Sequence, residues 1–184
     1  MVCLKARILL SGGIDSMACI SFYLKEKYDI ECLFCDYGQP AVEQEYKAAK
    51  SIADFFGVKI FFLKTNSILV PEVGEIYGRN AFLVLQSMCF FGAESYKMVI
   101  GIHSGTTYAD CTEAFVDAMN RVLDCYANGT VCLEAPFIVW SKKEIVEYCL
   151  INNLPIELTY SCEKGSSPPC GSCLSCRDRK EFEI

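Results

Sequence analysis

Four cysteines crowd into a short segment near the C-terminal end of this 184-residue chain: Cys162, Cys170, Cys173 and Cys176, separated by seven, two and two residues. Four thiolates at such spacing can form a closed tetrahedral shell around a zinc ion, and the glycines and prolines between them supply the turns that a metal knuckle needs. A shell with no open position for water indicates a structural Zn²⁺ site rather than a catalytic one. An iron–sulfur cluster is the main alternative.

A second candidate for chemistry is the segment Ser11-Gly12-Gly13-Ile14-Asp15-Ser16. The two glycines let the backbone turn sharply, so its N–H groups and the N-terminus of a following helix can bind an anion. Ser11 and Ser16 can donate further hydrogen bonds, while Asp15 can bind Mg²⁺ or a loop amide. The segment lacks the Gly-Lys-Ser/Thr ending of common nucleotide triphosphatases and has no G-x-G-x-x-G. We interpret it as a phosphate-binding loop, with a plain glycine turn as the alternative.

Alternating strands and helices must position these groups. Apolar runs and helical periodicity predict strands over 7–10, 30–35, 58–63, 98–102 and 131–133, and helices over 15–27, 42–56, 81–95 and 112–125. A loop is expected over 65–80, and Ser141-Lys142-Lys143-Glu144 opens a last long helix as a capping box. This alternation predicts a parallel α/β sheet with helices on both faces. Because the composition changes after Tyr160, we expect an α/β domain over 1–160 and a metal module over 161–184.

Composition limits the partners and the compartment. A net charge of −6 argues against a nucleic-acid backbone binder. No apolar stretch is long enough to span a bilayer and the first residues do not form a signal peptide, so we expect no membrane contact and a cytoplasmic location. There, 13 cysteines indicate metal binding or burial rather than disulfides. A 52% hydrophobic content favours an exposed apolar patch, and hence a homodimer or a protein partner.

The remaining cysteines are expected to be core residues. Cys32 and Cys35 lie three apart in a predicted strand, so their side chains should point to opposite faces rather than form a redox pair. Cys111 is a conceivable nucleophile, but no base is placed beside it in the sequence, and a filler role is preferred. Small buried side chains are also expected at Cys3, Cys19, Cys89, Cys125, Cys132 and Cys149.

The glycine loop resembles the pyrophosphate loop of the ATP pyrophosphatase (PP-loop) superfamily, whose members split ATP into AMP and pyrophosphate to adenylate a carboxylate, an amide or a ring carbonyl. Over nearly its whole length the chain resembles the 7-cyano-7-deazaguanine synthase family. The resemblance rests on segments 36–39, 78–80, 108–111, 136, 141–146, 159–162 and 170–179, together with the loop itself. It implies a Rossmann-like, adenine nucleotide alpha hydrolase-like sheet with a small C-terminal zinc-binding module.

This resemblance implies an ATP-dependent, C–N-bond-forming ligase of queuosine biosynthesis that uses ATP, Mg²⁺ and structural Zn²⁺. Its substrates would be the deazapurine 7-carboxy-7-deazaguanine and ammonia. ATP would activate the carboxylate as an adenylate, and ammonia would give the amide. A second ATP would activate the amide oxygen, and loss of AMP would leave the nitrile.

The resemblance also assigns roles to individual positions. ATP and Mg²⁺ would be bound by Ser11, Gly12, Gly13, Asp15, Ser16, Asp36 and Gly101. The catalytic residues would be Asp15, Lys142 and Asp110. The substrate would contact Tyr37, Arg79, Asn80, Tyr108 and Asp110. Surface or cap roles remain open for Arg79 and Asn80, and Asp110 would serve equally well as the N-cap of the helix over 112–125.

The chain departs from the family pattern on the presumed substrate side. Pro40 and Ala41 replace an expected Arg-His pair, and Thr112 replaces an expected arginine. The stretch 101–108 is shortened and lacks an acidic residue, and the segment between Leu63 and Arg79 is abbreviated. These losses leave open a divergent paralogue that adenylates another acceptor, such as a protein partner or a nucleic acid base, for example to attach a deazaguanine group. A tRNA thiolation enzyme is disfavoured by the acidic charge and by the strand position of Cys32 and Cys35.

Overall fold

The computed structural model describes residues 4–65, 76–103, 105–106, 108–182 and 184. Its centre is a parallel five-stranded sheet with the strand order β3-β2-β1-β4-β5. The strands are β1 (Lys5–Leu9), β2 (Asp29–Asp36), β3 (Lys59–Lys64), β4 (Tyr96–Ile100) and β5 (Val131–Glu134). The order reverses between β1 and β4, and in open parallel sheets ligands bind at the carboxyl ends of strands beside such a reversal. The predicted Rossmann-like α/β sheet is confirmed.

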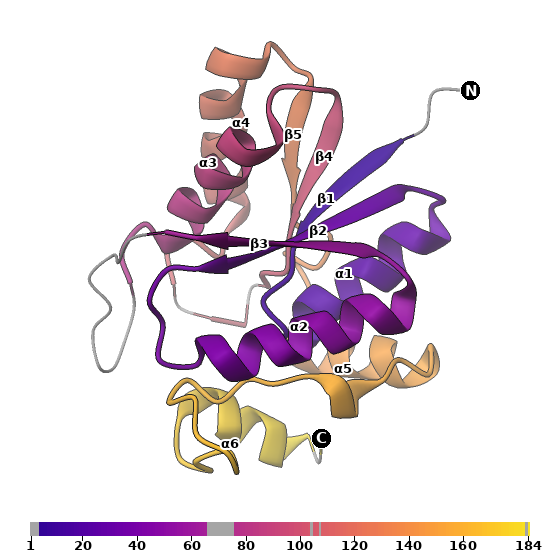
Figure 1. Ribbon diagram of the computed structural model, residues 1–184, viewed down its shortest axis with the longest axis vertical. Helices are drawn as coiled ribbons and strands as arrows, with labels where there is room; N and C mark the ends of the chain where they lie inside the picture. The colour runs from indigo at the N-terminus through magenta and orange to yellow at the C-terminus, as the bar shows by residue number, and fades with distance from the viewer. Residues whose placement is uncertain (1–3, 66–75, 104, 107, 183) are drawn as a thin grey trace.

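Helices cover both faces of the sheet, as predicted (Figure 1). One face carries α1 (Ile14–Lys25), α2 (Val42–Phe56) and α5 (Lys142–Ile151), which pack into one hydrophobic core. The other face carries α3 (Arg79–Phe91) and α4 (Glu113–Ala127), which pack into a second core. No helix of the described residues is long and apolar enough to cross a membrane.

The side chains of β2 alternate between these two cores. Cys32 belongs to the core beneath α1 and α2, whereas Cys35 belongs to the core beneath α3 and α4. Burial raises the pKa of each thiol to about 12, so both remain protonated near neutral pH. The prediction that these two cysteines face opposite sides of the sheet is confirmed.

Most helix and strand limits lie within two or three residues of the predictions. The predicted helix 42–56 is reproduced, and Gly57 ends it in the left-handed conformation. The capping box at Ser141 is present, with Glu144 completing it. The predicted helix 81–95 was wrong at both ends: it starts at Arg79 and stops after Phe91, because Gly92 adopts a φ of 78° and breaks it. The next strand therefore begins at Tyr96 rather than at residue 98.

Three cysteines expected to be buried are exposed, whereas Cys19 and Cys149 are buried as predicted. Cys132 alternates outward on β5, the last strand of the sheet order. Cys89 and Cys125 lie on helices of which one side faces solvent. Amphipathic helices are apolar on one side only. The residue type of a cysteine on such a helix therefore does not show whether its thiol is buried or exposed. Cys3 and most of the expected loop 65–80 lie outside the described residues.

The C-terminal segment contains two short elements that the sequence did not predict, η1 (Ile156–Leu158) and α6 (Leu174–Glu181). The chain reaches the glycine loop here, where the amide of Tyr160 donates to the carbonyl of Gly12 at 2.9 Å. A Cβ at Gly165 would lie 2.4 Å from the carbonyl oxygen of Pro40, so the module packs closely on the α/β unit. Figure 1 shows α6 and its flanking loops beneath α2 and α5.

Candidate functional site

The glycine loop joins β1 to α1 and is tightly enclosed. Gly12 has a φ of 85°, and a Cβ there would lie 2.5 Å from the carbonyl oxygen of Glu45 on α2. A Cβ at Gly101, after β4, would lie 2.8 Å from the amide nitrogen of Ser16. Ser16 Oγ donates to the carbonyl of Gly13 at 2.9 Å and lies 3.2 Å from Ser11 Oγ. Only glycine fits at these close approaches, and they hold the first turn of α1 in place.

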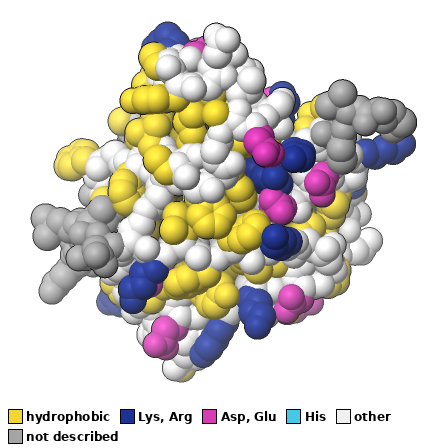
Figure 2. Space-filling view, turned by 45° about the horizontal axis from the view of Figure 1, so that its top comes forward, with side chains coloured by type: hydrophobic (Ala, Val, Ile, Leu, Met, Phe, Trp, Pro, Cys, Tyr) yellow, Lys and Arg dark blue, Asp and Glu magenta, His cyan; other side chains and the backbone are white. Residues whose placement is uncertain are grey.

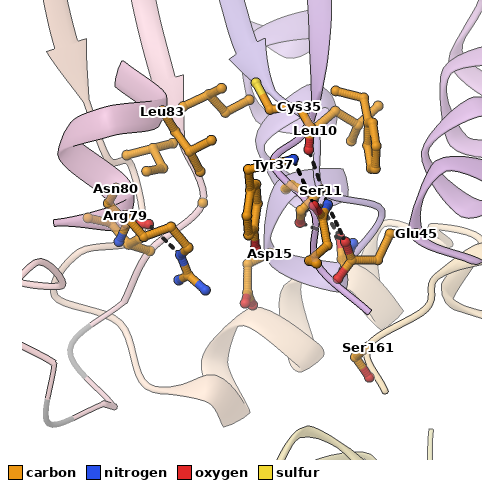
Figure 3. A pocket seen from close by; sticks show the side chains of 18 of the residues that line it. Leu10, Ser11, Asp15, Cys35, Tyr37, Glu45, Arg79, Asn80, Leu83 and Ser161 are labelled. Carbon is orange, nitrogen blue, oxygen red and sulfur yellow. Dashed lines mark hydrogen bonds between the residues drawn. The ribbon is translucent and has the colours of Figure 1, made fainter. Parts of the chain in front are cut away.

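A cavity of about 310 Å³ opens beside this loop at the carboxyl ends of the strands. Its volume is that of a small-ligand pocket. Figure 3 shows Arg79 and Asn80 of α3 on one side of the cavity and Glu45 of α2 on the other. Of the residues predicted for the site, the structure gathers Ser11, Gly13, Asp15, Ser16, Tyr37, Arg79, Asn80 and Gly101 in its wall.

Asp15 and Lys142 form an ion pair next to this cavity. Lys142 Nζ lies 2.7 Å and 2.9 Å from the two carboxylate oxygens of Asp15. Lys142 does not line the main cavity, but it lines a smaller one of about 110 Å³, to which Asp15 also contributes. The pair therefore joins the first turn of α1 to the start of α5, where both helix N-termini favour an anion.

His103 follows β4 and lies close to this ion pair. Burial lowers its pKa, Asp15 partly offsets that effect, and Lys142 lowers the pKa further. Its Nδ1 accepts a hydrogen bond from the amide of Gly105 at 3.0 Å, so the neutral ring carries its proton on Nε2. The sequence analysis did not include this histidine among the site residues.

Glu45 lines the main cavity, although the sequence analysis did not include it among the site residues. Its carboxylate accepts a hydrogen bond from Gln39 Nε2 at 3.0 Å, and both residues line the main cavity. Burial raises the pKa of Glu45, while Gln39 and then Arg79 pull it down. Helical spacing carried the signal, because Glu45 precedes the buried Ala48 and Ala49 by three and four positions.

Four predicted ATP or substrate residues do not line the main cavity: Gly12, Asp36, Tyr108 and Asp110. Asp36 Oδ1 accepts from the amide of Gly38 at 3.0 Å and lies near Lys64, so the carboxylate stabilises the turn after β2. Tyr108 packs into the core beneath α3 and α4. The predicted contacts of both side chains with ligand stay untested.

Asp110 lies behind Asn80. Asp110 Oδ2 accepts the amide of Asn80 at 3.2 Å, which places the carboxylate at the N-terminal end of α3. The alternative that Asp110 caps the helix over 112–125 is wrong, because the N-cap of α4 is Thr112, whose side chain accepts from the amide of Phe115 at 3.1 Å. Burial raises the pKa of Cys111, which supports its interpretation as a filler rather than a nucleophile.

The four clustered cysteines converge as the sequence predicted. Their Sγ atoms all lie within 4.8 Å of one another. The Sγ atoms of Cys170 and Cys176 are 3.9 Å apart, close to the ~3.8 Å edge of a tetrahedron with ~2.3 Å zinc–sulfur bonds. The amide of Cys170 donates to Cys162 Sγ at 3.3 Å, and the amide of Cys173 donates to Cys170 Sγ at 3.4 Å. This donor set has the spacing to hold a metal ion.

The thiols of the cluster differ in pKa. Burial raises the pKa of Cys162, but hydrogen bonds from the Cys170 amide and the Ser166 hydroxyl outweigh it and lower the value to about 5. At Cys176 burial and the neighbouring thiol of Cys173 raise the pKa to about 12. A metal ion bound there would allow all four sulfurs to be thiolates this close together, because a coordinated thiol loses its proton.

Comparison with known proteins identifies the family. The chain matches the family described as "Queuosine biosynthesis protein QueC" over residues 5–70 and 70–182. It is 31% identical over 199 residues to the 7-cyano-7-deazaguanine synthase 2 of Desulfitobacterium hafniense, covering 94% of this chain and 85% of the relative. It is 30% identical over 212 residues to the 7-cyano-7-deazaguanine synthase of Methanothermobacter thermautotrophicus, covering 98% and 95%.

A solved structure shares the fold. It is a protein from Methanocaldococcus jannaschii described as a predicted subunit of tRNA methyltransferase, with a TM-score of 0.55 and 13% identity over 80% of this chain and 76% of that one. At this identity the likeness concerns the fold alone. The family match, the relatives at about 30% identity and the gathered loop residues agree, and the chain belongs to the QueC family.

Proposed function

We propose that this protein is an ATP-dependent ligase that converts 7-carboxy-7-deazaguanine and ammonia to 7-cyano-7-deazaguanine, as the names of its relatives suggest. One observation carries the proposal: the loop Ser11–Ser16 opens onto a cavity of ligand size beside the Asp15–Lys142 ion pair. Two ATP-dependent activations, first of the carboxylate and then of the amide oxygen, would each release pyrophosphate and then AMP.

In this proposal the loop amides and Lys142 bind the phosphates, because adenylation concentrates negative charge on them. Asp15 holds the Lys142 ammonium group in position through both carboxylate oxygens. Two carboxylates, Asp15 and Asp178, line the smaller cavity, and carboxylate oxygens are ligands that Mg²⁺ prefers. Magnesium bound there would neutralise phosphate charge.

The deazapurine would occupy the main cavity, whose wall includes Tyr37, Arg79 and Asn80. The Arg79 guanidinium suits the substrate carboxylate, since its planar fork matches carboxylate geometry. Asp110 would act by positioning Asn80, through the bond to its backbone amide and through a second bond from Asn80 Nδ2 to the Asp110 carbonyl at 3.2 Å. Pro40 and Ala41, which stand where the resemblance expects an Arg-His pair, pack against Gly165.

The metal of the four-cysteine cluster would be Zn²⁺ in a structural role, because all four positions of a tetrahedral shell are taken by protein sulfur. In this proposal residues 1–160 form an α/β domain and residues 161–184 form a metal module. The cysteines of the described residues are all free, which suits the reducing cytoplasm.

A homodimer is part of the proposal. Exposed apolar side chains lie on α3 and α4, with Phe90 and Val122 each 39% exposed and Tyr126 71% exposed. Figure 2 shows hydrophobic side chains across the face that it presents, with basic and acidic side chains interspersed rather than gathered into a basic surface. A strictly monomeric mass by sedimentation would contradict this part of the proposal. No comparison supports a protein or nucleic-acid acceptor.

The proposal is tested with purified protein, Mg-ATP, ammonia and 7-carboxy-7-deazaguanine, with products separated by chromatography and weighed by mass spectrometry. We expect the nitrile, with two AMP and two pyrophosphate formed per nitrile. Starting instead from the amide, half as much AMP should accompany each nitrile. AMP without amide or nitrile would point to another acceptor and overturn the proposed substrate. No ATP consumption with either substrate would overturn the proposal as a whole.

A further inference from the structure

The smaller cavity lies where the glycine loop, α5 and the four-cysteine module meet. The loop contributes Gly13, Ile14 and Asp15, and α5 contributes Lys142. The module contributes Ser161, Ser175, Asp178, Arg179 and Ile184. This cavity shares Gly13, Asp15, Ser161 and Ser175 with the wall of the main cavity. A ligand that extends from one cavity to the other would pass the first turn of α1.

Arg179 brings a positive charge to this cavity from α6, three positions after the metal ligand Cys176. Its Nη1 donates to Thr159 Oγ1 at 2.7 Å and to the Thr159 carbonyl at 3.3 Å, which anchors the side chain near the loop. Within the part of the chain that the structure describes, Arg179 forms no ion pair with a carboxylate. A half-buried guanidinium group without a paired anion favours an anionic ligand.

The side-chain hydroxyl group of Ser161 is a second, independent indication that a ligand binds in this cavity. Its Oγ is buried and has no hydrogen-bond partner among the described residues. Ser161 precedes the metal ligand Cys162 and lines both cavities. A buried hydroxyl group without a partner costs free energy, and a phosphate oxygen of a bound ligand would satisfy it.

We propose that Arg179 and Ser161 bind the pyrophosphate part of ATP, so that the metal module is a wall of the nucleotide site as well as a structural unit; this inference rests on the proposed function. The glycine-loop amides and Lys142 contact the same phosphates from the α/β domain. Arginine forms paired hydrogen bonds with phosphate oxygens, and its fixed fork suits such a bridge. A metal bound by the four cysteines would hold Cys162 and Cys176 together, and Ser161 and Arg179 are close to these two cysteines in the chain.

The test compares Arg179→Gln with Arg177→Gln, a matched control that removes the same charge from an exposed position of the same helix. Affinities for Mg-ATP, inorganic pyrophosphate with Mg²⁺, and AMP are measured by calorimetry. We expect Arg179→Gln to weaken ATP and pyrophosphate binding about 10- to 100-fold, the loss typical of charged hydrogen bonds, while AMP binding stays unchanged. Arg177→Gln should bind all three ligands like the wild type.

Metal content, melting temperature and a second variant distinguish phosphate binding by Arg179 from a purely structural role. Arg179→Lys keeps the charge, and we expect it to bind pyrophosphate more tightly than Arg179→Gln at normal metal content. Wild-type pyrophosphate affinity in Arg179→Gln would overturn the inference. So would an equal loss of AMP and pyrophosphate binding in both Arg179 variants. A wild-type protein that binds neither ATP nor pyrophosphate would instead overturn the proposed function itself.

Discussion

Asp15 and Lys142, 127 positions apart in the chain, meet at 2.7 Å and join the first turns of α1 and α5. Helix N-termini carry partial positive charge, and the lysine adds a full one. The Asp15 carboxylate balances this charge in the free protein and fixes the direction of the ammonium group. Such preorganised charge is what a reaction that develops negative charge on phosphate requires.

Replacing Lys142 should therefore impair adenylation more than folding. We expect Lys142→Ala and Asp15→Ala each to lower the rate of pyrophosphate release by about 100-fold or more, the usual cost of removing a charge-stabilising group. Lys143→Ala is the matched control, because Lys143 is exposed and pairs only loosely with Glu147 at 3.8 Å. Normal pyrophosphate release by both site variants in a steady-state assay would remove the pair from the site.

Gly12→Ala should destabilise the fold through a steric clash. A Cβ at Gly12 meets the Glu45 carbonyl at 2.5 Å, and the positive φ adds strain. Gly129→Ala shares the positive φ but has no atom within 4 Å of the new Cβ, so it measures the strain alone. We expect about 1–2 kcal/mol for Gly129→Ala and about 2–5 kcal/mol for Gly12→Ala in urea unfolding. If both variants lost the same free energy of unfolding, the contact between α2 and the loop would add no steric clash.

Metal analysis of the purified protein should find about one zinc per chain. Cys173→Ser should lose that metal and unfold at a temperature about 10 °C lower, since ~4 kcal/mol corresponds to roughly that shift in a chain of this size. Cys125→Ser, at an exposed cysteine outside the cluster, should keep both metal and melting temperature. Iron with visible absorbance, in place of zinc, would contradict the assignment.

Glu45 should make stability depend on pH. Burial raises the pKa of its carboxyl group in the folded state, so the protonated form is favoured there and stability falls as pH rises from about 4.5 through the folded pKa. Glu45→Gln keeps the shape and can still accept from Gln39. We expect Glu45→Gln to unfold at a higher temperature than the wild type at pH 7.5, with the difference shrinking toward pH 4.5. A constant difference across that range would contradict the raised pKa.

Local patterns in the sequence determined much of this protein. Apolar runs, the capping box at Ser141 and the glycine at position 57 are features that neighbouring residues decide, and they placed most of the strands and helices. The four-cysteine cluster was equally visible, because all four cysteines lie within one short segment that can close on itself. The glycine loop was visible for the same reason, since its motif occupies six consecutive residues.

Tertiary structure decided what the remaining polar residues do. The sequence could not show that Asp110 reaches the N-terminal end of α3, or that Arg179 lines the same cavity as Lys142. These relationships join residues far apart in the chain, and they depend on how helices and the metal module pack on the sheet. The exposed positions of Cys89, Cys125 and Cys132 have the same origin. Residue type states what a side chain can do, whereas packing decides which partner it meets.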